Sequence, residues 1–100
     1  MKYRLVVKEE ALADIAEAMK WYQPKSVSLD DRFLATVECT FQKITANPFP
    51  FKKVYRNFRQ TSLRPFPYVI LYMPEKNTVV VYAVFNTWQH PKKKLSRLKK

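Results

Sequence analysis

The residues most capable of chemistry lie in the second half of the chain. His90 is the single histidine, and it stands just before a run of lysines. An imidazole in that setting can act as a general acid or base. The competing interpretation, which the sequence favours, is a partly exposed turn histidine before Pro91.

Cationic residues form a second group of candidates. Arg56, Arg59 and Arg64 fall on or between adjacent predicted strands, where acidic residues are almost missing. Such a surface contacts phosphate groups or an acidic protein, and the alternative is a solvated sheet face. Trp88 could stack on a base or fasten the C-terminal segment to the core. The candidate target-binding residues are Lys52, Lys53, Arg56, Trp88, Lys92, Lys93, Lys94 and Arg97.

The positive charge is confined to one half of the chain. The protein has 100 residues and a net charge of +11. Acidic and basic residues cancel over residues 1–50, so residues 51–100 carry the whole excess. This asymmetry suggests one face built for a polyanion or for an acidic protein partner. We expect a single domain over 1–100, with a basic tail at 88–100.

The composition excludes several classes of protein. Glycine is absent, so glycine-rich phosphate loops are impossible, and sharp turns fall to proline and asparagine. Cys39 is the single cysteine and no grouping has metal-ligand spacing, so we expect neither a metal nor a small-molecule cofactor. With no signal-peptide pattern and no membrane-length apolar run, the sequence predicts a cytoplasmic protein without membrane contact.

The apolar periodicity predicts an α+β fold. A strand over 3–8 precedes a helix that begins at Glu9 and ends before Pro24. A second helix, with Ser28 as its N-cap, runs to Asn47. The strands that follow are expected near 52–56, 58–64, 67–73 and 78–85, the last of them central because it is apolar on both faces. The expected architecture is an N-terminal strand and an antiparallel helical hairpin packed on a small, mostly antiparallel sheet, written β-α-α-β-β-β.

Several helix residues are expected to have structural roles alone. Trp21 and Tyr22 close the first helix and are expected to pack in the core or hairpin rather than to form a ligand cage. Cys39 lies roughly opposite the apolar stripe of the second helix, so we expect it to be exposed and not catalytic. Asp14 and Glu17 are expected on a solvated helix face.

Four fragments of the chain, taken in order and spacing, resemble one protein family. They are EALADIAEAMKWY, TVECTFQKITANPFPF, FPYVILY, and VVVYAVFNT before HPKK. Each fragment alone is unspecific, but the ordered set covers nearly the whole chain. On these fragments the sequence resembles the ParE/RelE toxins of type II toxin–antitoxin systems.

The resemblance implies a fold, a partner and one of two targets. The fold is the helical hairpin on a small sheet, and the partner is a cognate antitoxin, acidic and partly disordered, whose C-terminal segment wraps the toxin. RelE-like members enter the ribosome and cleave mRNA, whereas ParE-like members act on DNA gyrase without nuclease chemistry.

The residues at the implied nuclease site discriminate between the two targets. Where RelE-like nucleases carry two arginines, the spacing places Val69 and Trp88 in this chain. Losing each charge stabiliser would cost about 3 kcal/mol of transition-state stabilisation. Arg59 matches a strand lysine of the nucleases and Arg64 could replace a missing arginine, so these two and His90 would be catalytic in a RelE-like enzyme.

The sequence therefore favours a ParE-like toxin, which is not an enzyme and inhibits growth by binding an essential protein such as DNA gyrase. The first alternative is a RelE-like, ribosome-dependent mRNA endoribonuclease, which the overall positive charge favours. The second is an inactive family member that binds only its antitoxin.

Overall fold

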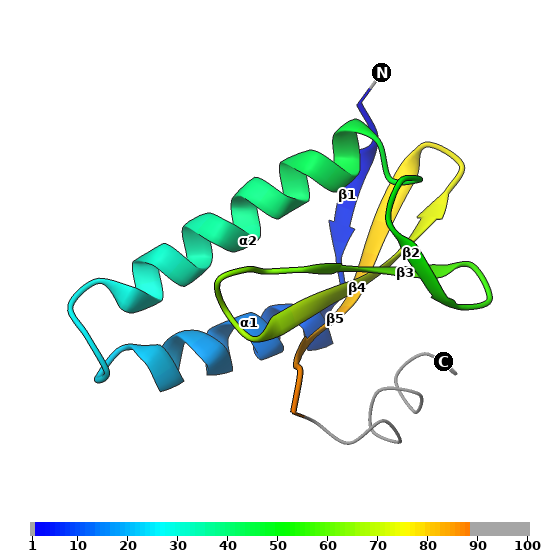
Figure 1. The fold of residues 1–100 in the computed structure, drawn as a ribbon. Coiled ribbons are helices and arrows are strands. Elements are labelled where there is room, and N and C mark those ends of the chain that lie inside the picture. Colours follow the sequence, from blue (N-terminus) through cyan, green and yellow to red (C-terminus); the bar gives the residue numbers. More distant parts are fainter. Residues whose placement is uncertain (1, 89–100) are drawn as a thin grey trace.

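The structure is a computed structural model that describes residues 2–88 of the chain. Its elements are β1 (Arg4–Val7), α1 (Glu9–Tyr22), α2 (Leu29–Ala46), β2 (Lys52–Tyr55), β3 (Phe58–Ser62), β4 (Tyr68–Glu75) and β5 (Thr78–Asn86). Figure 1 shows the two helices and the sheet that they cover. The predicted α+β fold is confirmed. Four strands follow the helices, as the expected strand ranges indicated, so the formula β-α-α-β-β-β is one strand short.

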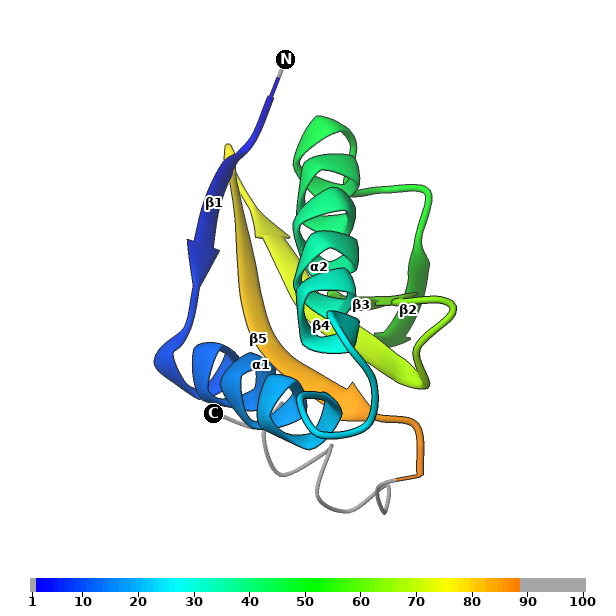
Figure 2. The same cartoon turned by 90° about the vertical axis from the view of Figure 1, so that its left-hand side faces the viewer.

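The sheet is mixed and has the strand order β1-β5-β4-β3-β2. β1 runs parallel to β5, and each of the other neighbouring pairs is antiparallel. β1 and β2 therefore form the two edges. Most of β5 is buried, which confirms its expected central place. Both helices lie on the same face of this sheet (Figure 2).

The first helix follows directly from its residue spacing. Ala11, Ile15 and Ala18 recur at intervals of three and four residues, and all three are buried. Acidic residues occupy the first turn, where they interact favourably with the helix dipole. The helix packs along β5 and stops two residues before Pro24. α1 thus covers the central strand.

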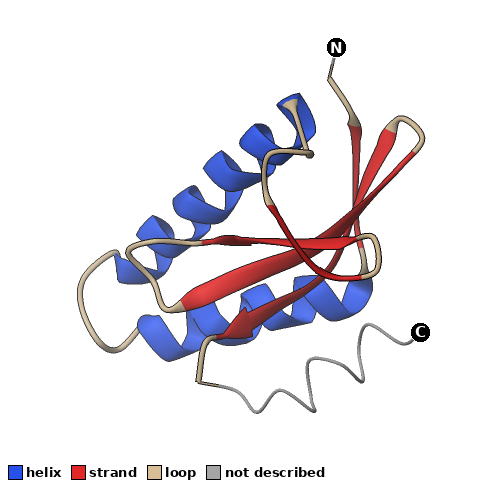
Figure 3. Ribbon diagram, turned by 45° about the vertical axis from the view of Figure 1, so that its right-hand side comes forward, coloured by secondary structure: helices blue, strands red, loops and turns tan. Residues whose placement is uncertain are grey.

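The second helix buries Phe33, Val37 and Ile44. Ser28 holds its N-cap position, as predicted, but has a left-handed backbone with φ of 63° and makes no side-chain capping hydrogen bond. The N-cap prediction is therefore right in position and wrong in its expected chemistry. Figure 3 shows the two helices diverging from the short loop that joins them.

Apolar side chains pack on both faces of the sheet. On the helix side, Phe33 contacts the rings of Tyr22, Phe66 and Tyr68, with centroid separations of 5.5, 5.1 and 5.1 Å. The opposite face carries a second cluster. It consists of Phe58, Leu71, Ala83 and Phe85, with Val54, Tyr55, Val69, Met73 and Tyr82 packed around them.

A β-bulge interrupts the central hairpin. The register of β4 and β5 shifts between Leu71 and Tyr72, which makes Tyr82 the extra residue of β5. Beyond the bulge the alternation of faces is reversed, so Val81 and Val84 both belong to the helix-side cluster. The bulge therefore sets which side chains at the end of β5 face α1.

The absence of glycine places other residues in left-handed backbone conformations. Within residues 2–88, positive φ occurs at Ser28, Arg56 and Lys76. Arg56 and Lys76 each open a two-residue hairpin turn, with an asparagine in the second place. Asparagine does occur in both turns, as expected, but the positive φ falls on the residue before it. A positive φ costs a residue with a Cβ about 1–2 kcal/mol relative to glycine.

This strain leads to a prediction for the β4–β5 turn. Lys76→Gly is expected to raise the free energy of unfolding by about 0.5 kcal/mol, because the relief of strain at φ of 55° exceeds the added chain entropy. Thermal unfolding followed by circular dichroism should show a midpoint about 3 °C higher. Lys76→Ala is the control, since it removes the charge and keeps the Cβ. Equal midpoints for the two variants would contradict the explanation.

Candidate functional site

The β2–β3 hairpin gathers three of the predicted target-binding cations. Lys52 and Lys53 are exposed on the edge strand β2, and Arg56 is exposed in the turn. The guanidinium carbon of Arg56 lies 5.3 Å from the centroid of the Tyr55 ring. This hairpin therefore places three exposed cations at one edge of the described sheet.

Arg59, in contrast, is engaged in holding a loop. Its Nη1 donates hydrogen bonds to the backbone carbonyls of Phe49 and Phe51, at 2.9 and 2.8 Å. Its Nε is buried without a hydrogen-bond partner. The Tyr72 hydroxyl reinforces the same loop by donating to the carbonyl of Pro48 at 2.7 Å. Burial raises the pKa of Tyr72, which keeps this hydroxyl protonated as a donor.

Arg64 lies apart from Arg59. It is exposed in the loop between β3 and β4, and its backbone N–H donates to Oγ of Ser62 at 3.2 Å. Arg59 lies within β3, whereas Arg64 lies in the turn two residues beyond the end of that strand. The two arginines therefore occupy different elements, one half-buried and the other exposed. His90, Lys92, Lys93, Lys94 and Arg97, the remaining predicted residues, lie outside the described part of the chain.

Val69 lies in apolar surroundings. It is half-buried on the sheet face opposite the helices, in the cluster around Leu71 and Phe85. Its strand partners are Ser62 on β3 and Phe85 on β5, so neither paired residue supplies a cation. A phosphoryl group placed against Val69 would thus find no positive charge on Val69 or on its two strand partners.

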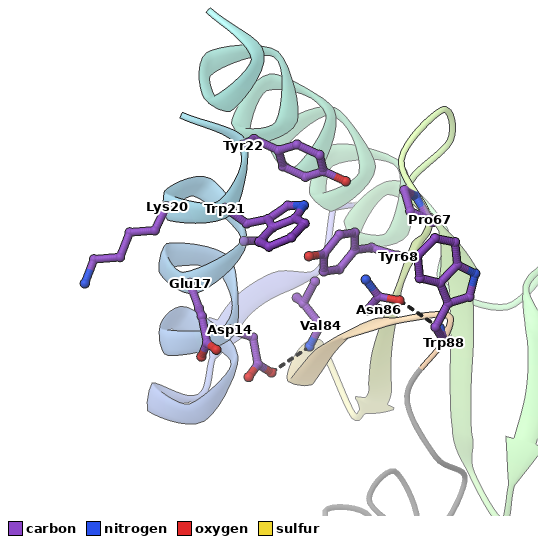
Figure 4. A pocket seen from close by; sticks show the side chains of 11 residues that line it. Asp14, Glu17, Lys20, Trp21, Tyr22, Pro67, Tyr68, Val84, Asn86 and Trp88 are labelled. Atoms are coloured by element: carbon purple, nitrogen blue, oxygen red, sulfur yellow. Dashed lines mark hydrogen bonds between the residues drawn. The ribbon is translucent and has the colours of Figure 1, made fainter. Parts of the chain in front are cut away.

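A cleft that the sequence did not reveal lies between α1 and the adjoining ends of β4 and β5 (Figure 4). Its volume is about 890 Å³. The lining residues are Asp14, Glu17, Ala18, Lys20, Trp21, Tyr22, Pro67, Tyr68, Val84, Asn86 and Trp88. The cleft is thus aromatic, with two carboxylates on the α1 side.

The cleft begins where β1 stops. β1 pairs with β5 only as far as Val81, so among residues 2–88 no strand lies beside the later part of β5 on that edge. In this part of β5, the backbone N–H of Val84 donates its hydrogen bond to a side chain, Oδ2 of Asp14, at 2.9 Å. Asp14 and Val84 are 70 positions apart, and no local pattern marks the contact.

The two tryptophans lie at the surface of this cleft. Trp21 is 60% exposed and Trp88 is 85% exposed, so neither is part of the core. Trp21 is therefore not in the core, one of the two structural places expected for it, whereas Tyr22 does pack against Phe66. Burial, followed by the proximity of Tyr68, raises the pKa of Tyr22. Cys39, as expected, is exposed.

Residues 2–88 contain no candidate metal site and no candidate membrane span. Among residues 2–88, no three His, Cys, Asp or Glu side chains gather closely enough to hold a metal ion. Neither helix in that range is both long and apolar enough to span a bilayer.

Comparison with known proteins places the chain in a family. Residues 5–91 match the family model described as the ParE toxin of the type II toxin–antitoxin system parDE. No curated protein sequence matches the chain.

Similar solved structures have low sequence identity and share the fold. The RelBE2 toxin–antitoxin complex of Mycobacterium tuberculosis has 22% identity and a TM-score of 0.63, covering 86% of this chain and 99% of that one. The chromosomal ParDE system of Pseudomonas aeruginosa has 13% identity and a TM-score of 0.64, with coverages of 85% and 96%. A free, mutant Escherichia coli RelE toxin has 19% identity and a TM-score of 0.62, with coverages of 97% and 94%.

The matched range runs from the second residue of β1 past the end of β5, so it includes both helices, all of the described sheet except Arg4, and the cleft. The chain therefore belongs to the ParE toxin family of type II toxin–antitoxin systems.

Proposed function

We propose that this toxin is ParE-like in mechanism as well as in family: it inhibits growth by binding an essential protein, DNA gyrase, and not by cutting RNA. The observation that carries the proposal is Val69. Where the resemblance implies an arginine of the RelE-like nucleases, this chain has a valine within an apolar cluster on the sheet. A developing negative charge on a phosphorane would find no stabilising donor there.

The position of Arg59 supports the same proposal. A catalytic cation must be free to contact the reacting phosphate, yet the Nη1 of Arg59 already bonds two loop carbonyls. Of the implied catalytic cations in residues 2–88, Arg64 alone has an exposed side chain, in the turn after β3. Cleavage needs several groups free to converge on the phosphate, and Arg59 is already engaged by the loop.

We propose a cognate antitoxin as the second partner. Two of the similar structures are described as toxin–antitoxin systems or complexes. The cations Lys52, Lys53 and Arg56 on the β2–β3 hairpin are exposed, and acidic residues are scarce around them in the sequence. An acidic, partly disordered antitoxin segment complements such a surface and folds as it binds.

Two reactions with the purified chain distinguish the targets. In a DNA gyrase supercoiling reaction we expect inhibition that rises with toxin concentration. In a ribosome-dependent translation reaction we expect the mRNA to remain uncut. Cut mRNA together with active gyrase would contradict the proposal and support the RelE-like alternative, which the exposed hairpin cations favour. No effect in either reaction would indicate a family member that binds its antitoxin only.

Induction in bacteria without antitoxin extends the test to variants. The double variant Arg64→Ala, His90→Ala is expected to inhibit growth as strongly as the parent, with DNA-damage signalling preceding any loss of translation. Arg64 is a suitable site because its side chain is exposed and its fold contact is made by the backbone N–H. Loss of toxicity in this variant, with antitoxin binding intact, would indicate catalysis and overturn the proposal.

A further inference from the structure

The cleft beside α1 differs in chemistry from the cationic β2–β3 hairpin that is proposed to bind the antitoxin. It combines two exposed tryptophans with two carboxylates on a protein whose net charge is +11. We propose that this cleft is a docking site for an arginine side chain, flanked by apolar residues, on a protein partner.

The aromatic walls are suited to a cation. Trp21 and Trp88 present exposed indole rings, and such rings attract cations placed over their faces. The Trp21 ring already holds a cation of the same chain over its face, because Nζ of Lys25 lies 4.0 Å from the ring centroid. Lys25 does not line the cleft, so a ligand in the cleft would approach these aromatic groups from elsewhere.

The charges of the cleft select against an anion. Asp14 and Glu17 line the α1 side of the cleft with their carboxylates close to each other below the Trp21 ring, whereas the Lys20 side chain extends away from the aromatic rings (Figure 4). The hydrogen bond from Val84 fixes the Asp14 carboxylate in place. The base of a nucleotide could stack on the tryptophans, but the phosphates of that nucleotide would be repelled by the two carboxylates.

Arginine fits the combination better than lysine does. Its planar guanidinium stacks on aromatic faces, is weakly hydrated, and forms paired hydrogen bonds with a carboxylate. The cleft offers both kinds of contact. Pro67 and Val84 add apolar lining on which the neighbours of that arginine can pack. Charge complementarity thus identifies the occupant as a basic, partly apolar segment, which is the opposite of what the cationic β2–β3 hairpin would bind.

The chain contains its own reporter for this binding. It has two tryptophans, and both line the cleft, so intrinsic tryptophan fluorescence follows the cleft specifically. The probe is the capped peptide acetyl-Leu-Arg-Leu-amide, titrated into the full chain. We expect a saturable change of emission and an affinity about tenfold higher than for the same peptide with citrulline, which is nearly isosteric and uncharged.

A matched pair of variants separates local from overall charge. Glu17→Gln is expected to weaken the arginine peptide about fivefold, whereas Glu38→Gln, the same change on the exposed surface of α2, should leave its affinity unchanged. Equal affinity for the arginine and citrulline peptides, equal weakening by both variants, or no change of emission would each overturn the proposal. Saturable binding of heptathymidylate, detected by tryptophan emission and tighter in Glu17→Gln than in the parent, would also overturn the proposal. The cleft would then be a nucleic-acid site.

Discussion

Replacing Arg59 with alanine is expected to lower the free energy of unfolding by about 2 kcal/mol. The change removes two charge-assisted hydrogen bonds to the carbonyls of Phe49 and Phe51, together with the packing of the side-chain stem. Urea unfolding followed by circular dichroism measures the loss as a lower midpoint at unchanged slope. Arg59→Lys should recover part of the stability, because an ammonium can also donate to carbonyls, but from a more flexible stem than the planar guanidinium whose Nη1 contacts both.

The control for Arg59 stands directly opposite it on the neighbouring strand. Lys53 pairs with Arg59 across β2 and β3 and is exposed, so Lys53→Ala should change the stability by less than about 0.5 kcal/mol. The same comparison bears on function. A catalytic Arg59 would lose toxicity on substitution while the fold stayed as stable as the parent. Unchanged stability in Arg59→Ala would therefore contradict the structural role assigned here.

The largest loss of stability is expected for Phe33→Ala, at about 4 kcal/mol. Phe33 is fully buried and contacts three rings, those of Tyr22, Phe66 and Tyr68. Removing it combines the lost transfer energy with a cavity that three rigid rings cannot easily fill. Because a domain of this size is stable by only about 5–15 kcal/mol, thermal unfolding should begin at a clearly lower temperature.

Val27→Ala serves as the control for Phe33, since Val27 is 93% exposed in the loop between the helices. It should leave the unfolding curve unchanged. Phe33→Leu should fall between the two, because leucine fills part of the space. If Phe33→Ala were no less stable than Val27→Ala, Phe33 would not be the centre of the helix–sheet core.

Periodicity was sufficient for the helices because each buries one face, whereas the inner strand β5 was recognised from apolar residues on both of its faces. Ala11, Ile15, Ala18 and Tyr22 follow one stripe of α1, and all four pack inward. Trp21 lies outside this stripe, because one step along a helix rotates the side chain by about 100°. Its position next to Tyr22 therefore predicts exposure, although its large apolar side chain suggests the core.

The functional residues were less accessible to sequence reasoning. The role of Arg59 depends on the position of the loop 48–51, whose carbonyls it contacts. No pattern near residue 59 predicts where that loop lies. The cleft depends on β1 being too short to cover the end of β5, and on Asp14 bonding a strand 70 positions away. Both are tertiary contacts between distant segments, whereas the exposed cations of β2 follow from composition and strand position alone.

The extra residue at Tyr82 bears on how members of this family should be aligned. Up to Val81 each residue of β5 pairs with one residue of β4, but Tyr82 is an extra residue of β5 without a partner position on β4. A relative that lacks the bulge needs a one-residue gap inside the strand. Equivalences beyond it, including the residue that corresponds to Trp88, should therefore be assigned by superposing the sheets and then reading the sequences.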